Sequence, residues 1–171
     1  MLFIIKGEML MIQVLFVCLG NICRSPMAEA IFRHKVAAAG LSETIAVASA
    51  ATSHWEVGSI PHKGTRNILA QQGISATGLR ATQITASDFD HYDYIIALDQ
   101  NNLRDLKEMA PKNQWQKIHL FMEPVAGQSE KEVPDPYYTG DFDETYAMIN
   151  MGTNAWLSKL KQDLAKKKIK K

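Results

Sequence analysis

Cys18 and Arg24 are the two residues of this chain whose types and spacing most directly indicate chemistry. A cysteine thiolate is a nucleophile, and a guanidinium group can bind two oxygens of one phosphate with its planar fork. The backbone N–H groups of a tight loop that leads into a helix converge on one point and bind anions there. The spacing therefore predicts a phosphate-binding loop beside Cys18, placed for phosphoryl transfer to sulfur. Its residues are Leu19, Gly20, Asn21, Ile22, Cys23 and Arg24.

The segments on either side of this loop are those that such a site needs. Residues 14–17 form an apolar run rich in β-branched side chains, which predicts a buried parallel strand over residues 12–17. Gly20 and Asn21 are residue types that enter left-handed backbone at low cost. Ser25 is a good N-cap for a helix over residues 26–39, and the proline that follows it suits a first turn. A buried strand cysteine before a capped helix is the alternative, but the register of strand, turn and helix favours catalysis.

A second candidate site residue, Asp135, lies far downstream between Pro134 and Pro136 and precedes Tyr137 and Tyr138. Proline restricts its own backbone and that of the residue before it. We therefore expect Asp135 to be held in an extended conformation, with its carboxylate pointing where the loop directs it.

These motifs resemble those of a known family. The segment from Cys18 to Pro26 resembles the active-site loop of the low-molecular-weight protein tyrosine phosphatases, and residues 135–138 resemble that family's general-acid loop. The two motifs together, in this order, are far more specific than either alone. The resemblance extends from about Gln13 to the final helix. It implies a single α/β domain that hydrolyses phosphotyrosine in protein substrates without a metal or other cofactor.

The resemblance also implies a role for each site residue. Cys18 would attack phosphorus and form a phosphocysteine intermediate, while Arg24 holds the phosphate and Ser25 donates a hydrogen bond to the sulfur. Asp135 would protonate the leaving oxygen and then accept a proton from the attacking water. A hydrogen bond between Asn21 and Ser49 would support the loop. The walls of the substrate cleft would be Ile22, Trp55, Tyr137 and Tyr138.

Two positions have a second interpretation, and a third departs from the family pattern. Cys23 would either condense with an oxidised Cys18 and protect it, or simply be a small buried residue of the loop. Trp55 would otherwise be a core or hinge aromatic. Gln72 departs from the family, because many relatives have a histidine there that acts near the general acid through an aspartate, here Asp99.

Three other functions fit parts of the pattern. Thioredoxin-coupled arsenate reductases share the fold and the loop but need further cysteines, and this chain has only Cys18 and Cys23. Protein-arginine phosphatases carry a threonine in place of Ile22 and lack the tyrosine pair after the Asp-Pro, so both features favour phosphotyrosine. A non-catalytic phosphate-binding or redox-sensing module would have no use for Asp135.

The rest of the chain alternates strands and helices with short connections. Strands are predicted at residues 12–17, 45–50, 94–98 and 118–121, and helices at 26–39, 61–72, 100–109 and 141–168. This alternation predicts an α/β fold, with one open parallel sheet of about four strands and helices on both faces.

Length and composition predict one globular domain. The 171 residues are 46% hydrophobic and 22% charged, with a formal net charge of +1. Residues 11–168 are expected to form the domain, residues 1–10 an N-terminal extension or start artefact, and residues 166–171 a basic, solvated tail.

Neither a nucleic-acid partner nor a membrane span is expected, and a monomer is favoured. Two cysteines within one loop do not staple a secreted fold, which favours a cytoplasmic protein.

Overall fold

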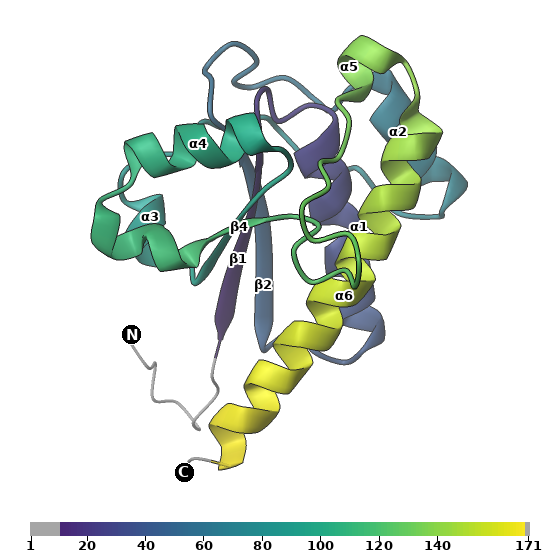
Figure 1. Cartoon of the computed structure of the whole chain (residues 1–171). Helices are drawn as coiled ribbons and strands as arrows, with labels where there is room; N and C mark the ends of the chain where they lie inside the picture. The colour runs from purple at the N-terminus through teal and green to yellow at the C-terminus, as the bar shows by residue number, and fades with distance from the viewer. Residues whose placement is uncertain (1–10, 170–171) are drawn as a thin grey trace.

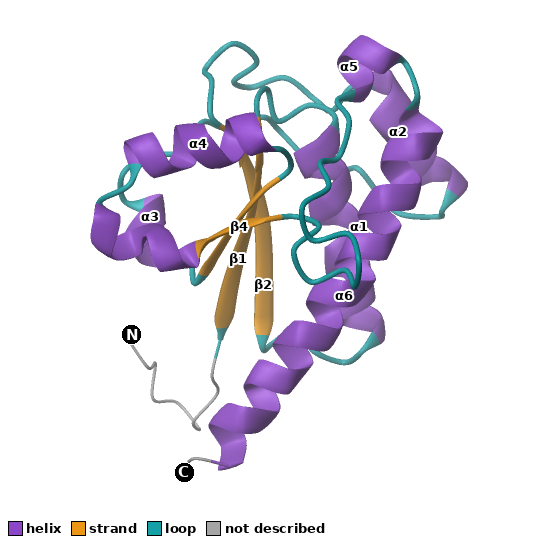
Figure 2. Cartoon of the chain, in the orientation of Figure 1, coloured by secondary structure: helices purple, strands orange, loops and turns teal. Residues whose placement is uncertain are grey.

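The sheet is built around the strand that ends at Cys18. In the computed structural model, which describes residues 11–169, four parallel strands lie in the order β2-β1-β3-β4 (Figure 2). They are β1 (Ile12–Cys18), β2 (Ile45–Ala51), β3 (Tyr94–Ala97) and β4 (Ile118–Leu120). β1 therefore has β2 on one side and β3 on the other, which makes its carboxyl end a topological switch point. Open α/β sheets bind ligands at such points.

Helices cover both faces of this sheet. Figure 1 shows α1, α2 and α6 on one side and α3 and α4 on the other. The helices are α1 (Arg24–Ala38), α2 (Lys63–Gln71), α3 (Asp88–His91), α4 (Gln100–Met109), the 3-10 helix η1 (Lys112–Lys117), α5 (Pro136–Thr139) and α6 (Phe142–Ile169). The predicted fold class, a single α/β domain with a four-stranded parallel sheet, is confirmed.

The side chains of β1 alternate between two hydrophobic cores. Val14 and Phe16 belong to the core beneath α1 and α6, whereas Leu15 and Val17 belong to the core beneath α3 and α4. Successive residues of a strand point to opposite faces, so a strand buried on both faces needs a continuous apolar run. The sequence of β1 supplies that run.

Helix α6 packs closely against the Phe121 ring at Gly152. At Gly152 an added Cβ atom would come within 2.1 Å of a ring carbon of the buried Phe121. Lys35 of α1 forms a second tie, because its ammonium donates hydrogen bonds to the backbone and side-chain oxygens of Asn150 and to the hydroxyl of Thr153. α1 and α6 are thus joined by both close packing and polar contacts.

The prediction of Ser25 as the N-cap of the first helix is wrong. α1 begins at Arg24, Cys23 occupies the N-cap position, and no side chain caps this end. The Ser25 hydroxyl instead contacts the Cys18 sulfur and accepts a hydrogen bond from Asn21. The chain enters the helix earlier because the phosphate-binding loop itself forms the helix N-terminus.

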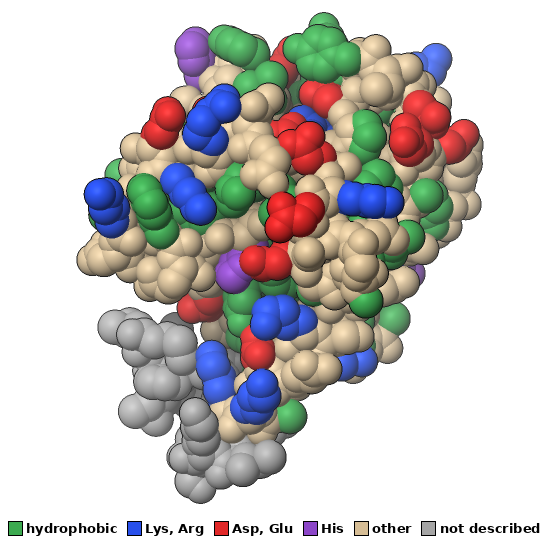
Figure 3. All heavy atoms as spheres, in the orientation of Figure 1, with side chains coloured by type: hydrophobic (Ala, Val, Ile, Leu, Met, Phe, Trp, Pro, Cys, Tyr) green, Lys and Arg blue, Asp and Glu red, His purple; other side chains and the backbone are tan. Residues whose placement is uncertain are grey.

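Other boundaries differ by smaller amounts. α2 begins at Lys63, two residues later than predicted, because His62 is its N-cap. The short elements α3, η1 and α5 have only four to six residues each, too few for a periodic pattern to predict them. α6 continues through the lysine-rich segment to Ile169, and basic side chains are spread over the lower part of the surface in Figure 3. The predicted extension at residues 1–10 and residues 170–171 of the predicted tail lie outside the described residues.

Candidate active site

Cys18 is the last residue of β1 and lies at the centre of a tight loop. Only 3% of its surface is exposed. Its sulfur accepts a hydrogen bond from the Asn21 backbone N–H at 3.3 Å and lies 3.0 Å from the Ser25 hydroxyl oxygen. Asn21 has a φ of 59°, as predicted for this turn, whereas Gly20 does not adopt the left-handed conformation. The backbone therefore curls around the sulfur, with Asn21 at the strained position.

The side chain of Asn21 holds this conformation in place. Its amide nitrogen donates to the Ser25 hydroxyl at 2.6 Å and to the Ser49 hydroxyl at 2.9 Å. Its amide oxygen accepts from the Thr82 backbone N–H at 3.1 Å. The expected hydrogen bond between Asn21 and Ser49 is confirmed. Three hydrogen bonds from one side chain offset the cost of left-handed backbone at a residue other than glycine.

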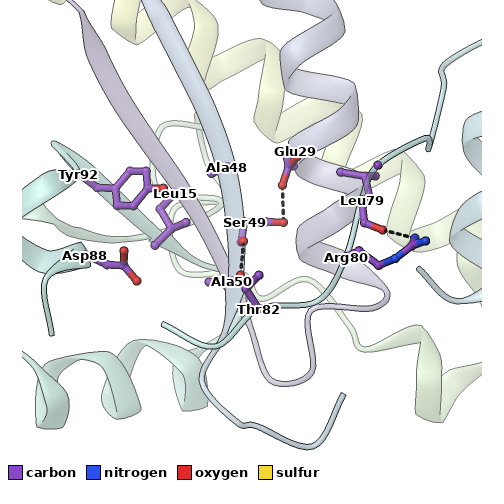
Figure 4. Close-up of a pocket in the computed structure, with 11 residues that line it drawn as sticks. Leu15, Glu29, Ala48, Ser49, Ala50, Leu79, Arg80, Thr82, Asp88 and Tyr92 are labelled. Carbon is purple, nitrogen blue, oxygen red and sulfur yellow. Dashed lines mark hydrogen bonds between the residues drawn. The ribbon is translucent and has the colours of Figure 1, made fainter. Parts of the chain in front are cut away.

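A buried carboxylate, Glu29, lies behind this network. The Ser49 hydroxyl donates to Glu29 at 2.6 Å, and Arg33 forms an ion pair with Glu29 at 2.7 Å. Figure 4 shows Glu29 and Ser49 on the wall of a cavity of about 260 Å³. A chain of hydrogen bonds thus runs from Glu29 through Ser49 and Asn21 to the Ser25 hydroxyl beside Cys18. Glu29 is not among the site residues predicted from the sequence, although its position one helical turn after Ser25 places both side chains on one face of the helix.

Arg24 is nearly inaccessible to solvent, and three hydrogen bonds to other residues hold its guanidinium group. Nη1 donates to Asp99 at 2.6 Å and to the Val133 carbonyl at 3.0 Å, and Nη2 donates to Asp135 at 3.2 Å. Nε is buried and has no hydrogen-bond partner among the described residues. Of the five N–H groups, these three contacts leave the one on Nε and one on Nη2, and these two nitrogens share one edge of the guanidinium plane. An edge with two such donors can bind two oxygens of one phosphate.

The charge of Arg24 is secured by its neighbours. Burial alone would lower the pKa of Arg24, but the charge of the Cys18 sulfur and the contacts with Asp99 and Asp135 outweigh burial and raise it. Asp99 is itself fixed, because its second carboxylate oxygen caps α4 by accepting from the Asn102 backbone N–H at 2.7 Å. The guanidinium group is therefore both charged and rigidly oriented.

Asp135 has the extended backbone that its two prolines predict, with φ −83° and ψ 110°. One carboxylate oxygen accepts from the Tyr137 backbone N–H at 3.1 Å, which caps the short helix α5. The other oxygen faces Arg24. The structure therefore brings the predicted acid to the predicted phosphate-binding arginine, although 111 residues separate them in sequence.

The predicted wall residues are mostly exposed. Ile22 is half-buried, while Trp55, Tyr137 and Tyr138 are 69%, 60% and 74% exposed. Trp55 is thus not a core aromatic. The loop that carries it is fastened to the phosphate-binding loop, because the backbone N–H groups of Thr52 and Ser53 donate to the carbonyls of Cys18 and Leu19.

Cys23 differs from Cys18 in its surroundings. It is 4% exposed, and burial, followed by the charges of Cys18 and Asp135, raises the pKa of the Cys23 thiol to about 12. Both cysteines are free thiols. Cys23 is therefore protonated at neutral pH, and Cys18 is the cysteine with a hydrogen-bonded sulfur.

Residues 11–169 contain neither a metal-binding cluster nor a membrane-spanning helix. No group of three or more histidine, cysteine, aspartate or glutamate residues there is arranged to hold a metal ion. None of the helices in this part of the chain combines the length and the apolar character needed to cross a membrane.

Comparison with known proteins identifies the family. A family model described as low molecular weight phosphotyrosine protein phosphatase matches residues 13–167. The low molecular weight protein-tyrosine-phosphatase YfkJ of Bacillus subtilis is 45% identical over 153 residues, which cover 90% of this chain and 98% of YfkJ. The crystal structure of YfkJ superposes with a TM-score of 0.89 over 92% of this chain and 99% of that one. The structure of DARP, a Drosophila arginine phosphatase, is 35% identical with a TM-score of 0.80, over 86% of this chain and 97% of that chain. The chain therefore belongs to the low molecular weight phosphotyrosine protein phosphatase family and is a hydrolase of that family.

Proposed function

We propose that this protein hydrolyses phosphotyrosine in protein substrates through a phosphocysteine intermediate. The observation that carries the proposal is the free edge of Arg24, formed by Nε and Nη2, in a loop whose backbone curls around the Cys18 sulfur. A phosphate bound to that edge and to the N–H groups of residues 19–24 is presented to the nucleophile. Such preorganised donors are usually the largest contribution to catalysis of this kind.

The reaction proceeds in two displacements at phosphorus. The Cys18 thiolate attacks, the bond between phosphorus and the phenolic oxygen breaks, and Asp135 gives its proton to the departing oxygen. Water then attacks the phosphocysteine, Asp135 takes a proton from that water, and the S–P bond breaks to release phosphate. The Ser25 hydroxyl, 3.0 Å from the sulfur, stabilises the thiolate before the first step and after the second.

The predicted wall residues favour an aromatic substrate. A phosphotyrosine ring extends from the phosphate-binding loop to the height of Ile22, Trp55, Tyr137 and Tyr138, whereas a phosphoserine side chain is too short to reach them. An aromatic contact there contributes about 0.5–1.5 kcal/mol beyond the area it buries. These residues therefore support phosphotyrosine over phosphoserine.

Phosphoarginine is the second candidate substrate. It is supported by the likeness to DARP, whose name says that it is an arginine phosphatase. Ile22 and the Tyr137–Tyr138 pair both weigh against it, because protein-arginine phosphatases are expected to have a threonine in place of Ile22 and no tyrosine pair after the Asp-Pro.

A side-by-side assay on phosphotyrosine, phosphoserine, phosphoarginine and arsenate tests the proposal. We expect phosphotyrosine to have the highest kcat/KM. Cys18→Ser should abolish turnover while still binding inorganic phosphate, since the loop and Arg24 remain. Parent-like activity of Cys18→Ser would contradict the assignment of the nucleophile, and a preference for phosphoarginine would favour the second candidate.

The role of Asp135 is tested by varying the leaving group. Asp135→Asn should lower kcat/KM for phosphotyrosine, whose phenolate leaves poorly, by about 10²–10⁴-fold. It should lower kcat/KM for p-nitrophenyl phosphate much less, because that phenolate leaves without a proton. Equal proportional losses for both substrates would make Asp135 a structural residue.

We also propose that Cys23 protects Cys18 from irreversible oxidation. When peroxide converts Cys18 to a sulfenic acid, the sulfur loses its charge, which removes one of the causes that raise the pKa of Cys23. The Cys23 thiol can then condense with it to a disulfide and release water. Less activity should be recoverable with a thiol after peroxide in Cys23→Ser than in the parent, and equal recovery would leave Cys23 as a packing residue.

A further inference from the structure

His62 connects three parts of the site that are far apart in sequence. Its backbone N–H donates to the Ile22 carbonyl of the phosphate-binding loop at 2.7 Å. Its ring stacks on Phe142 at the start of α6, with the centroids 5.0 Å apart and the planes at 20°. The same ring meets Tyr137 of α5 at 6.4 Å and 82°. One half-buried residue therefore contacts the loop that follows β1 through its backbone, and the turn that carries Asp135 and the last helix through its ring.

The orientation of the His62 ring is fixed from two sides. Nδ1 accepts a hydrogen bond from the Gly64 backbone N–H at 3.0 Å, which makes the ring the N-cap of α2. On the other side, Phe142 packs so closely that a Cβ atom on Gly64 would lie 2.4 Å from its ring. The start of α2 is also tied to the loop by Thr65, whose hydroxyl donates to the Cys23 carbonyl at 2.9 Å.

The two functional groups of the acid loop are held differently. The Asp135 carboxylate is held by Arg24 and by the Tyr137 backbone N–H, neither of which involves His62. The Tyr137 ring is 60% exposed, and its other aromatic neighbour, Tyr138, is still more exposed at 74%. His62 is thus the anchored ring against which this exposed pair rests, through Tyr137.

We propose that His62 is a positioning residue that fixes the ring of Tyr137 as a wall of the substrate cleft, at a set place relative to the phosphate-binding loop. The inference rests on the proposed function, because it concerns how that site holds the ring of an aromatic phosphate. It assigns to His62 a part in substrate selection that is separate from its part in capping α2.

Two substitutions separate these parts. His62→Asn keeps an N-cap acceptor but removes the ring, and His62→Phe keeps the ring but removes the acceptor. Two probes separate the wall from the loop: benzylphosphonate has a phenyl ring, and inorganic phosphate has none. Dissociation constants for both probes, measured by calorimetry, and the melting temperature are compared with those of the parent protein.

We expect His62→Asn to bind benzylphosphonate about three- to tenfold more weakly while its affinity for inorganic phosphate and its melting temperature remain close to the parent values. His62→Phe should keep the affinity for benzylphosphonate and melt at a lower temperature. In turnover of phosphotyrosine, His62→Asn should raise KM by a similar factor and leave kcat within about twofold of the parent.

A second experiment tests whether His62 acts through Tyr137. In a Tyr137→Ala background, His62→Asn should cause no further loss of benzylphosphonate affinity, since the ring that it positions is gone. Additive losses would overturn the proposal, as would parent-like benzylphosphonate binding in His62→Asn or an equal loss for both probes. The proposed function fails by a different result, namely a parent protein that does not hydrolyse phosphotyrosine.

Discussion

Replacing Arg24 with lysine keeps a positive charge but changes the number and geometry of the donors. The guanidinium group has five N–H groups, of which three bind Asp99, Val133 and Asp135 and two form the free edge. A lysine ammonium has three N–H groups on a single nitrogen. With a phosphate bound, five acceptors therefore compete for three donors, and at least two hydrogen bonds are lost.

The size of the loss follows from the kind of hydrogen bond. A hydrogen bond to a charged group contributes about 1.5–3 kcal/mol, so two of them amount to about 3–6 kcal/mol. If both losses fall on the phosphate, kcat/KM decreases by about 10²–10⁴-fold, since about 1.4 kcal/mol corresponds to a factor of ten. If they fall on Asp99 and Asp135 instead, the folded state becomes less stable, because a carboxylate beside the loop is left without its partner.

The assay therefore measures activity and stability together, as kcat/KM for p-nitrophenyl phosphate and the melting temperature. Arg33→Lys is the matched control: Arg33 lies on the same helix and also pairs with a carboxylate, Glu29, but lies outside the phosphate-binding loop. We expect a large loss of activity in Arg24→Lys and little change in the control. A loss of less than tenfold in an Arg24→Lys protein with the parent melting temperature would refute the two-oxygen edge as the basis of phosphate binding.

Three further predictions concern other residues. Burial and the charge of Cys18 raise the pKa of Cys23 to about 12, so about 10⁻⁵ of this thiol is ionised at pH 7. Iodoacetamide should therefore label Cys18 long before Cys23. Equal labelling rates of the two cysteines in the folded protein, measured by mass spectrometry, would contradict this prediction. Gly152→Ala should lower the free energy of unfolding in urea titrations by about 1–3 kcal/mol or more, because the methyl group of the new alanine overlaps the Phe121 ring. An unchanged urea midpoint would show that α6 can move away from Phe121. Burial lowers the pKa of Lys35 to about 8, so between about pH 8 and 10.5 the unfolded state binds more protons than the folded state. The stability of the parent relative to Lys35→Met should therefore increase as pH rises through this range. A stability difference between the two proteins that does not vary with pH would contradict the shift.

The residues that the sequence predicts best are those whose backbone is determined locally. The strand that ends at Cys18 has a continuous apolar run from Val14 onward, the left-handed turn uses an asparagine, and Asp135 is held by the prolines on either side of it. Each of these signals lies within a few residues of the feature it specifies. The roles of Cys18, Arg24 and Asp135 in catalysis stay predictions, but the placement of these residues follows from local sequence and a parallel sheet.

The features that the sequence does not predict are those set by tertiary contacts. Ser25 has the sequence signature of an N-cap, yet its hydroxyl is used by the Cys18 sulfur and Asn21 across the loop. His62 has no metal-ligand spacing, and only the packing of α2 against α5 and α6 gives its ring a role. Gln72, at the position where the family resemblance implies a histidine, is an exposed residue at the end of α2. Asp99, which that histidine would act through, binds Arg24.

The contacts of Arg24 also determine when, during synthesis, the site can first exist. Its hydrogen bonds to Asp99, Val133 and Asp135 span 75, 109 and 111 residues. At about 5–20 residues per second, a ribosome adds Asp135 about 6–20 s after Arg24. Throughout that interval the growing chain lacks the proposed acid, and until Asp99 is added, 75 residues after Arg24, it lacks both carboxylate partners. The site is therefore complete only after 135 of the 171 residues have been joined, and a chain released before Asp99 is added carries Arg24 without either carboxylate that pairs with it in the finished protein.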